Sequence, residues 1–249
     1  RVNLSDLAAK AATPCGFLLS IALPPDWTNG WLAAFAQGLG ADARLFEIPL
    51  LGGDTTATPG PLTIAITAFG SAPRFVSRAG ARPGDGVYVS GAIGDAALGL
   101  RLRQDPTLGA ALSTVERDAL LNRYLLPNPR LDLVEMLRAG ASAAMDVSDG
   151  LAGDLAKLTR ASGVSAQVEV AHVPLTAAGQ ALIAHAPALL ETALTGGDDY
   201  EILFATGPGF APPPGVVRIG EIVAGAAAPV FSGWPASAQK PTKLSYSHF

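Results

Sequence analysis

Aspartate residues in this sequence recur beside glycine and serine where apolar segments end, and carboxylates in such places can bind cations. Charged residues make up only 15% of the chain, against about 25% in an average globular protein, so their placement is informative. Carboxylate, hydroxyl and backbone oxygens without accompanying histidine or cysteine are typical of Mg²⁺ or Ca²⁺ sites. The segments with this composition are 3–9, 52–56, 145–151 and 196–201.

The segment 145–151 offers the richest set of donors. Side chains alternate along a strand, so Asp146 and Ser148 are expected on one side of it, with Asp149 in the first turn of the helix that follows. Two carboxylates, a hydroxyl and a helix N-terminus can together hold a metal ion and a phosphate group. One aspartate would be enough to cap the helix, so we interpret this segment as functional.

For the other acidic segments, a purely structural role competes with a functional one. Asp198, Asp199 and Glu201 lie almost side by side, and because like charges repel, we expect cations or polar ligands to offset them. The paired glycines before Asp54 would let a ligand approach the backbone, although a simple glycine-rich turn remains open. Asp6 could merely complement the dipole of a first helical turn.

Composition excludes several classes of function. The net charge of −4 and the pI near 5.3 argue against nucleic acid as a partner. No Gly-x4-Gly-Lys-Ser/Thr pattern occurs, so the chain is not a P-loop nucleotide enzyme. The histidines and the single cysteine, Cys15, lack zinc-site spacing, and we expect Cys15 to be buried. Without a long apolar run or a signal-peptide pattern, we expect a cytoplasmic protein that does not bind a membrane.

Periodicity predicts the elements that position these residues. Helices and strands alternate loosely, which predicts a mixed α/β or α+β fold, and the change in composition near Ala72 predicts domains of 1–72 and 73–249. Asn3 or Ser5 is the expected N-cap of the first helix, and Ser113 with Glu116 fits a capping box. The expected helices are 5–13, 30–41, 94–103, 114–125, 130–139 and 149–161, and the expected strands are 17–23, 44–50, 62–69, 87–90, 142–147, 165–171, 200–205 and 216–223.

Taken together, these motifs resemble those of the thiamine-monophosphate kinases, which belong to the superfamily named for the aminoimidazole ribonucleotide synthetase fold. Single motifs of this kind are weak signals, whereas their occurrence in the family's order along nearly the whole chain is specific. The resemblance rests on 2–9 (VNLSDLAA), 51–56 (LGGDTT), Arg78 with 83–85 (PGD), 123–130 (RYLLPNPR), 145–151 (MDVSDGL) and 196–201 (GGDDYE).

The resemblance implies a two-domain synthetase-like fold and ATP-dependent phosphorylation of thiamine monophosphate to thiamine diphosphate. It implies several Mg²⁺ ions, direct transfer of the γ-phosphoryl group, and a homodimer whose N-terminal domains join. The physical properties of the motifs agree with such chemistry, because phosphoryl transfer depends mainly on positioning and on neutralising charge.

The resemblance also assigns roles to residues, position by position, with no catalytic side chain beyond the metal ligands. The implied Mg²⁺ ligands are Asp6, Asp54, Asp146 and Asp149, and the implied ATP contacts are Gly53, Asp54, Arg78 and Ser148. Asp198 would face the thiamine substrate, and Tyr246 would stack on its cationic ring. Tyr246 could instead be a surface aromatic residue near the C-terminus.

The sequence departs from the family at its beginning. Family members carry an upstream segment with a Gly-Asp-Asp motif, a Thr-Asp pair of metal ligands and a substrate-contacting histidine, which this sequence lacks ahead of Arg1. We therefore expect an incomplete N-terminal domain and metal site, and weak turnover from these residues alone. The alternatives are another ATP-using enzyme of the same superfamily, or a non-catalytic protein that binds nucleotides or thiamine phosphates.

Overall fold

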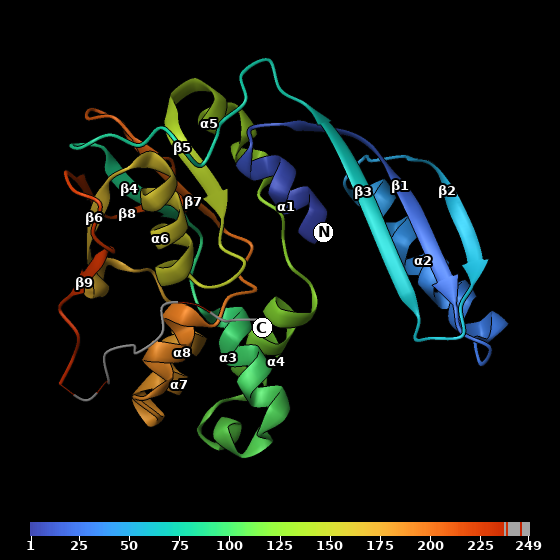
Figure 1. Ribbon diagram of the computed structural model, residues 1–249. Coiled ribbons are helices and arrows are strands. Elements are labelled where there is room, and N and C mark those ends of the chain that lie inside the picture. Colours follow the sequence, from blue (N-terminus) through green and yellow to red (C-terminus); the bar gives the residue numbers. More distant parts are fainter. Residues whose placement is uncertain (237, 239–244, 246–249) are drawn as a thin grey trace.

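The N-terminal part of the chain forms a small sheet that extends from the rest of the molecule (Figure 1). The computed structural model describes residues 1–236, 238 and 245. Helix α2 (Asn29–Leu45) lies along one face of this sheet. The central strand is parallel to one neighbour and antiparallel to the other, and the spatial order is β2 (Leu50–Ala57), β1 (Thr13–Leu23) and β3 (Thr63–Ser71).

The body of the molecule is built on a second, six-stranded sheet. On β4, Val87 and Val89 pack with the helix α6 (Leu151–Ser162), whereas Tyr88 packs on the opposite side with Phe204. This alternation is that of a strand buried on both faces. The spatial order is β5 (Ala141–Asp146), β7 (Ile202–Thr206), β4 (Gly86–Ser90), β8 (Val216–Val223), β6 (Ser165–Glu169) and β9 (Val230–Ser232).

Helices gather at one end of this sheet around a separate apolar cluster (Figure 1). Leu98, Leu120 and Leu182 are fully buried there. The helices are α3 (Asp95–Gln104), α4 (Thr114–Leu125), α7 (Ala177–His185) and α8 (Leu189–Thr195), with α5 (Val134–Gly140) beside β5 and short 3-10 helices at Pro106–Ala111, Leu131–Leu133 and Val170–His172.

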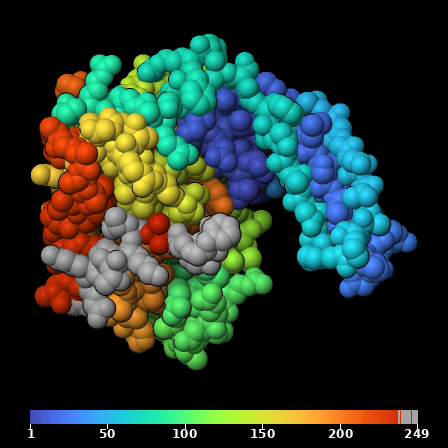
Figure 2. Space-filling model, in the orientation of Figure 1, coloured from blue at the N-terminus to red at the C-terminus, as the bar shows by residue number. Residues whose placement is uncertain are grey.

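Helix α1 (Val2–Ala9) connects the two sheets. Ala8 and Ala9 are buried among residues of the large sheet, whereas Leu4 packs with Phe17 and Ile48 of the N-terminal part. Figure 2 shows the small sheet and α2 as an arm on one side of the body, with an open hollow beneath it. Because α1 belongs to both cores, it holds its own polar residues between the arm and the body.

The structure confirms the mixed α+β class and most of the expected elements. Helix α4, with its Ser113–Glu116 capping box, and strand β8 have the expected bounds. The expected N-caps of the first helix were wrong, because the helix begins at Val2 and buries Ser5 within it. Helices α7 and α8 were not predicted, since their short apolar runs around Pro187 do not show a clear helical period.

The expectation of an extended segment at 44–50 was wrong, because α2 continues to Leu45 and the strand starts only at Leu50. The Gly-Gly-Asp motif therefore lies within β2 and not in a turn. Gly53 has a φ of +152°, and a Cβ atom there would lie 1.8 Å from the carbonyl oxygen of Leu19 on β1. Only glycine allows β1 and β2 to approach each other in this way.

Cys15 is exposed, so the expectation that it is buried was wrong. It lies where the pairing of β1 with β3 shifts between Pro14 and Gly16, and this irregularity interrupts the alternation of inward and outward side chains.

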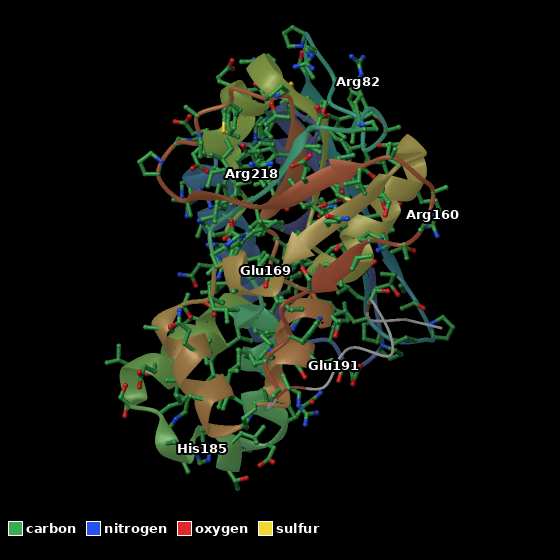
Figure 3. The ribbon with its side chains drawn as sticks, turned by 90° about the vertical axis from the view of Figure 1, so that its left-hand side faces the viewer. Arg82, Arg160, Glu169, His185, Glu191 and Arg218 are labelled. Atoms are coloured by element: carbon green, nitrogen blue, oxygen red, sulfur yellow. The ribbon has the colours of Figure 1, made fainter. Side chains whose placement is uncertain are left out.

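The outer strands of the large sheet present a polar face on the side opposite α6. Arg218 forms an exposed ion pair with Glu221, and Glu169 lies on the neighbouring strand β6 (Figure 3). A hollow of about 390 Å³ on this face is lined mainly by polar residues. In the part of the chain that the structure describes, no helix is long and apolar enough to cross a membrane.

Candidate active site

Asp6 and Asp146 are brought together by the packing of α1 against the end of β5. Asp146 is only 7% exposed, and burial together with the nearby Asp6 charge raises the pKa of its carboxyl group to about 6, although a hydrogen bond from Ser5 opposes the shift. Two carboxylates that lie this close in a partly buried place can be stabilised by a cation.

Two positively charged side chains accompany this acidic pair. The ammonium group of Lys10 donates a hydrogen bond to the carbonyl oxygen of Ala144, at 3.2 Å. Burial and then Arg78 lower the pKa of Lys10, while Asp146 and Asp6 raise it, so all four groups lie within electrostatic range. Carboxylates beside cations that are at least partly exposed can hold a metal ion and the oxygens of a phosphate group together.

The segment after Asp146 is fixed by a buried carboxylate that the sequence analysis did not single out. Asp154, on α6, accepts hydrogen bonds from the backbone N–H groups of Ser148 and Asp149, both at 2.9 Å, and is itself fully buried. Lys157 forms ion pairs with Asp154 and Asp149. The spacing of an aspartate and a lysine three residues apart on a helix could have indicated this pair.

The Asp198 segment lies directly against the Ser148 segment. The backbone N–H of Asp198 donates to the carbonyl oxygen of Ser148 at 2.9 Å, and that of Tyr200 donates to Val147 at 2.9 Å. A Cβ atom on Gly197 would lie 2.3 Å from the same Ser148 oxygen. Asp198 and Tyr200 have φ values of 63° and 52°. These left-handed conformations, unusual for residues with a Cβ, show that the fold holds the segment in place.

Asp199 and Glu201 are directed into the protein, where the groups that offset their charges belong to the chain itself. Asp199 accepts backbone hydrogen bonds from Gly94 at 2.8 Å and Ala96 at 3.3 Å, where α3 begins, and burial raises its pKa to about 8. Glu201 has side-chain partners of its own. It accepts hydrogen bonds from Ser90 Oγ at 2.5 Å, Arg123 Nη2 at 2.9 Å and Arg130 Nη1 at 2.8 Å.

Asp198 is the acid of this segment that remains partly exposed. Its carboxylate accepts a long hydrogen bond, 3.4 Å, from the hydroxyl group of Tyr200. Burial and the neighbouring charge of Asp198 raise the pKa of Tyr200, so its hydroxyl group stays protonated. The hydroxyl group and the carboxylate can therefore act as a donor and an acceptor side by side.

Other expected site residues are not brought to this place. Asp54 lies opposite Ser20 in the register of β1 and β2, is exposed, and accepts a hydrogen bond from the backbone N–H of Thr55 at 2.9 Å. Gly53 belongs to the same strand, on the arm, and no contact joins either residue to Asp6 or Asp146 among the described residues. Tyr246 lies outside the described residues.

The donors present suit Mg²⁺ in chemistry but supply only part of a coordination shell. Within residues 1–236, 238 and 245, no group of three or more His, Cys, Asp or Glu side chains could hold a metal ion. The paired carboxylates of Asp6 and Asp146 are hard oxygen donors, and Mg²⁺ commonly takes one or two carboxylates and completes its shell with water and substrate phosphate. The arrangement therefore fits a metal ion bound jointly by protein and phosphate.

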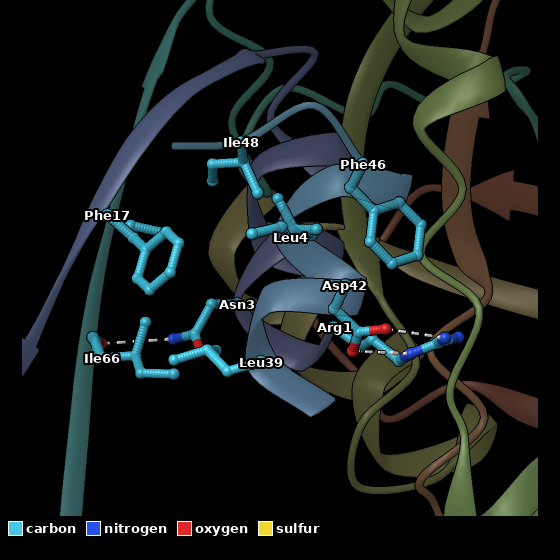
Figure 4. Close-up of a pocket in the computed structure, with 11 residues that line it drawn as sticks. Arg1, Asn3, Leu4, Phe17, Leu39, Asp42, Phe46, Ile48 and Ile66 are labelled. Atoms are coloured by element: carbon cyan, nitrogen blue, oxygen red, sulfur yellow. Dashed lines mark hydrogen bonds and ion pairs between the residues drawn. The ribbon is translucent and has the colours of Figure 1, made fainter. Parts of the chain in front are cut away.

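A separate pocket lies between α1 and the arm (Figure 4). It is lined mainly by apolar side chains, including Leu4, Phe17 and Ile66, with the Arg1–Asp42 ion pair at one side. Its volume is about 60 Å³, whereas small-molecule sites have about 300 Å³ or more. At this size the pocket is too small for a nucleotide.

Two protein-family models match the chain. The model of the AIR synthase related protein N-terminal domain matches residues 1–72, and that of the C-terminal domain matches residues 82–211.

The chain is also similar to individual proteins. A thiamine-monophosphate kinase of Caulobacter vibrioides is 43% identical over 213 residues, which are 84% of this chain and 59% of that protein. The crystal structure of the thiamine monophosphate kinase from Aquifex aeolicus is 31% identical, with a TM-score of 0.83 over 92% of this chain and 77% of that one. A structure described as AaThiL complexed with AMPPCP and TMP is 30% identical, with a TM-score of 0.88 over 100% of this chain and 78% of that one. The chain spans about three fifths of the length of the curated relative, 59%.

Proposed function

The chain belongs to the AIR synthase related protein family, and from this premise we propose that it carries out ATP-dependent phosphorylation of thiamine monophosphate to thiamine diphosphate. The observation that carries the proposal is the junction of the Asp146–Asp149 and Asp198–Tyr200 segments beside Asp6. This junction brings carboxylates, cations and a polar segment together. The relatives named thiamine-monophosphate kinase, one of them with AMPPCP and TMP, support the choice of substrates.

We propose that Asp6 and Asp146 hold Mg²⁺ together with phosphate oxygens, and that Asp149 and Asp54 contribute further metal contacts. When bound, such ions neutralise the charge of the phosphates during transfer. The clustered charges of Asp6 and Asp146 support the first assignment. We assign Arg78 and Ser148 to ATP, because the exposed Arg78 acts electrostatically on Lys10 beside that cluster and Ser148 follows Asp146 by two residues. Gly53 is proposed as a further ATP contact.

On the substrate side, we propose that Asp198 faces thiamine monophosphate and that Tyr246 stacks on its ring. A carboxylate can approach the cationic part of this substrate, and the strained backbone around Asp198 supports a functional role. We also propose a division into domains of 1–72 and 73–249, which the separate apolar cluster around Leu4, Phe17 and Ile48 supports.

The experiment that tests this function is ADP release from Mg-ATP in the presence and absence of thiamine monophosphate, followed by chromatography of the thiamine product. We expect ADP release that depends on the monophosphate, with thiamine diphosphate formed in equal amount. Selenophosphate-forming and aminoimidazole-forming assays test other enzymes of the superfamily. Ligand binding without any ADP from a folded protein would instead favour a non-catalytic binding protein.

We further propose that a second copy of the chain covers the exposed face of the arm. Leu18, Leu51 and Phe69 lie on its three strands and are 37%, 60% and 44% exposed. Apolar side chains gathered on one sheet face are costly to leave in water and commonly mark an interface. A twofold symmetric pairing of these arms would bury the face in both copies.

Light scattering tests this assembly. We expect twice the chain mass of 25.3 kDa, and we expect Leu18→Lys to weaken association by about 100-fold or more, because it places a charge in a buried interface. Val115→Lys is the matched control, since Val115 is 78% exposed on α4. A monomeric parent protein, or equal behaviour of the two variants, would contradict the proposal.

A further inference from the structure

Lys157 contacts a carboxylate that the proposed function assigns to a metal ion. Its ammonium group forms ion pairs with Asp149 and, at 2.7 Å, with Asp154. The side chains of Lys157 and Asp149 are 27% and 30% exposed, so the pair lies at the edge of the site, whereas that of Asp154 is 0% exposed. A fixed positive charge of the protein therefore lies where a divalent cation would approach Asp149.

Asp154 holds Lys157 in this place. One carboxylate oxygen of Asp154 accepts the backbone N–H groups of Ser148 and Asp149, and the other accepts the ammonium group. The backbone hydrogen bonds and complete burial prevent Asp154 from turning away. Lys157 is thus anchored on one carboxylate and shared with the second, more exposed one.

We propose that Lys157 competes with a divalent metal ion for Asp149 and so sets the metal concentration at which this part of the site fills. The proposal rests on the proposed function in one respect, that Asp149 is a metal ligand. Without metal, the ammonium group offsets the repulsion between Asp149 and Asp154. When a metal ion binds Asp149, the ammonium group must withdraw from that carboxylate, because it and the ion carry like charges.

The competition predicts a change in metal affinity that can be measured without substrates. Mn²⁺ serves as the probe, and electron paramagnetic resonance measures free Mn²⁺ in a titration of the full chain without nucleotide or thiamine monophosphate. We expect Lys157→Met to lower the dissociation constant of the Asp149-dependent site by about tenfold or more, since it removes a positive charge close to the ion. In an Asp149→Asn background, the same substitution should have no effect.

Two control variants separate the local contact from the general charge. Lys157→Arg keeps the positive charge and should leave the Mn²⁺ affinity closer to that of the parent than Lys157→Met does. Arg160→Met removes a charge from an exposed position on the same helix (Figure 3), and we expect little change. If Lys157→Met does not fold, as judged by its thermal melting curve, Lys157→Gln replaces it.

Unchanged or weaker Mn²⁺ binding by Lys157→Met would overturn the proposal. It would also be overturned if Lys157→Met changed the Mn²⁺ affinity equally in the parent protein and in the Asp149→Asn background. The result is distinct from that of the kinase assay. A protein that shows the Lys157 effect but no thiamine-monophosphate-dependent ADP release supports the competition and contradicts the proposed function. An active kinase whose Mn²⁺ affinity is the same with and without the Lys157 charge supports the proposed function and contradicts the competition.

Discussion

Asp146→Asn is expected to lower kcat/KM for Mg-ATP by about 100-fold or more while the protein remains folded. The substitution keeps the shape of the side chain and removes one of the two negative charges that face each other at the Asp6–Asp146 pair. A neutral amide binds Mg²⁺ far less strongly than a carboxylate does. The measurement is initial-rate kinetics of ADP release at several Mg²⁺ concentrations.

The same substitution should stabilise the metal-free protein near neutral pH. The pKa of Asp146 is about 6 in the folded state against an ordinary 3.8, so the folded state binds its proton more tightly than the unfolded state does. This contribution to stability is complete below about pH 4 and is lost as the pH rises through 6. At pH 7, Asp146→Asn should therefore raise the free energy of unfolding by up to about 3 kcal/mol, and at pH 3 the difference should disappear.

Denaturant unfolding at both pH values measures this difference. Asp118→Asn is the matched control, because Asp118 is an exposed aspartate on α4 and its replacement should change neither rate nor stability appreciably. Strong destabilisation by Asp146→Asn at neutral pH would show that the carboxylate is a structural group. Full activity of Asp146→Asn would show that Asp146 is not a metal ligand.

The meeting of Asp6 with Asp146 illustrates what the sequence could predict and what it could not. The local patterns located both aspartates and the strand end beside Asp146, because periodicity and glycine–serine punctuation are local properties. Their proximity depends on α1 packing its Ala8 and Ala9 against the large sheet. No spacing rule relates residues 140 positions apart in the chain, so only the motif resemblance predicted the meeting.

The acids at 198–201 illustrate the opposite case. Their clustering indicated that cations or polar ligands offset them and favoured a functional role, yet the partners of Asp199 and Glu201 lie within the protein. Arg123 lies 78 positions before Glu201 and still contacts it, at 2.9 Å. In a chain this poor in charge, an arginine with no assigned role of its own was a signal for a carboxylate elsewhere, but it did not identify which one.

Glu201→Ala is expected to lower the free energy of unfolding by about 3–5 kcal/mol, the effect of removing one partner from a buried ion pair. Glu201 is only 4% exposed, and its carboxylate joins Arg123, Arg130 and Ser90, which come from separate elements. The substitution leaves both guanidinium groups with a missing partner in a place that water reaches poorly. For a chain of this size the midpoint of thermal unfolding should fall by about 10 °C.

Glu221→Ala provides the matched control, since Glu221 pairs with Arg218 through side chains that are 52% and 53% exposed. An exposed pair of this kind contributes no more than about 1 kcal/mol. Equal losses in the two variants would contradict a stabilising role for the buried network. Because Glu201 immediately follows Tyr200 and precedes β7, the network also fixes the segment proposed to face the substrate. Glu201→Gln should lose less stability than Glu201→Ala. As the network weakens, the KM for thiamine monophosphate should rise more than the KM for ATP.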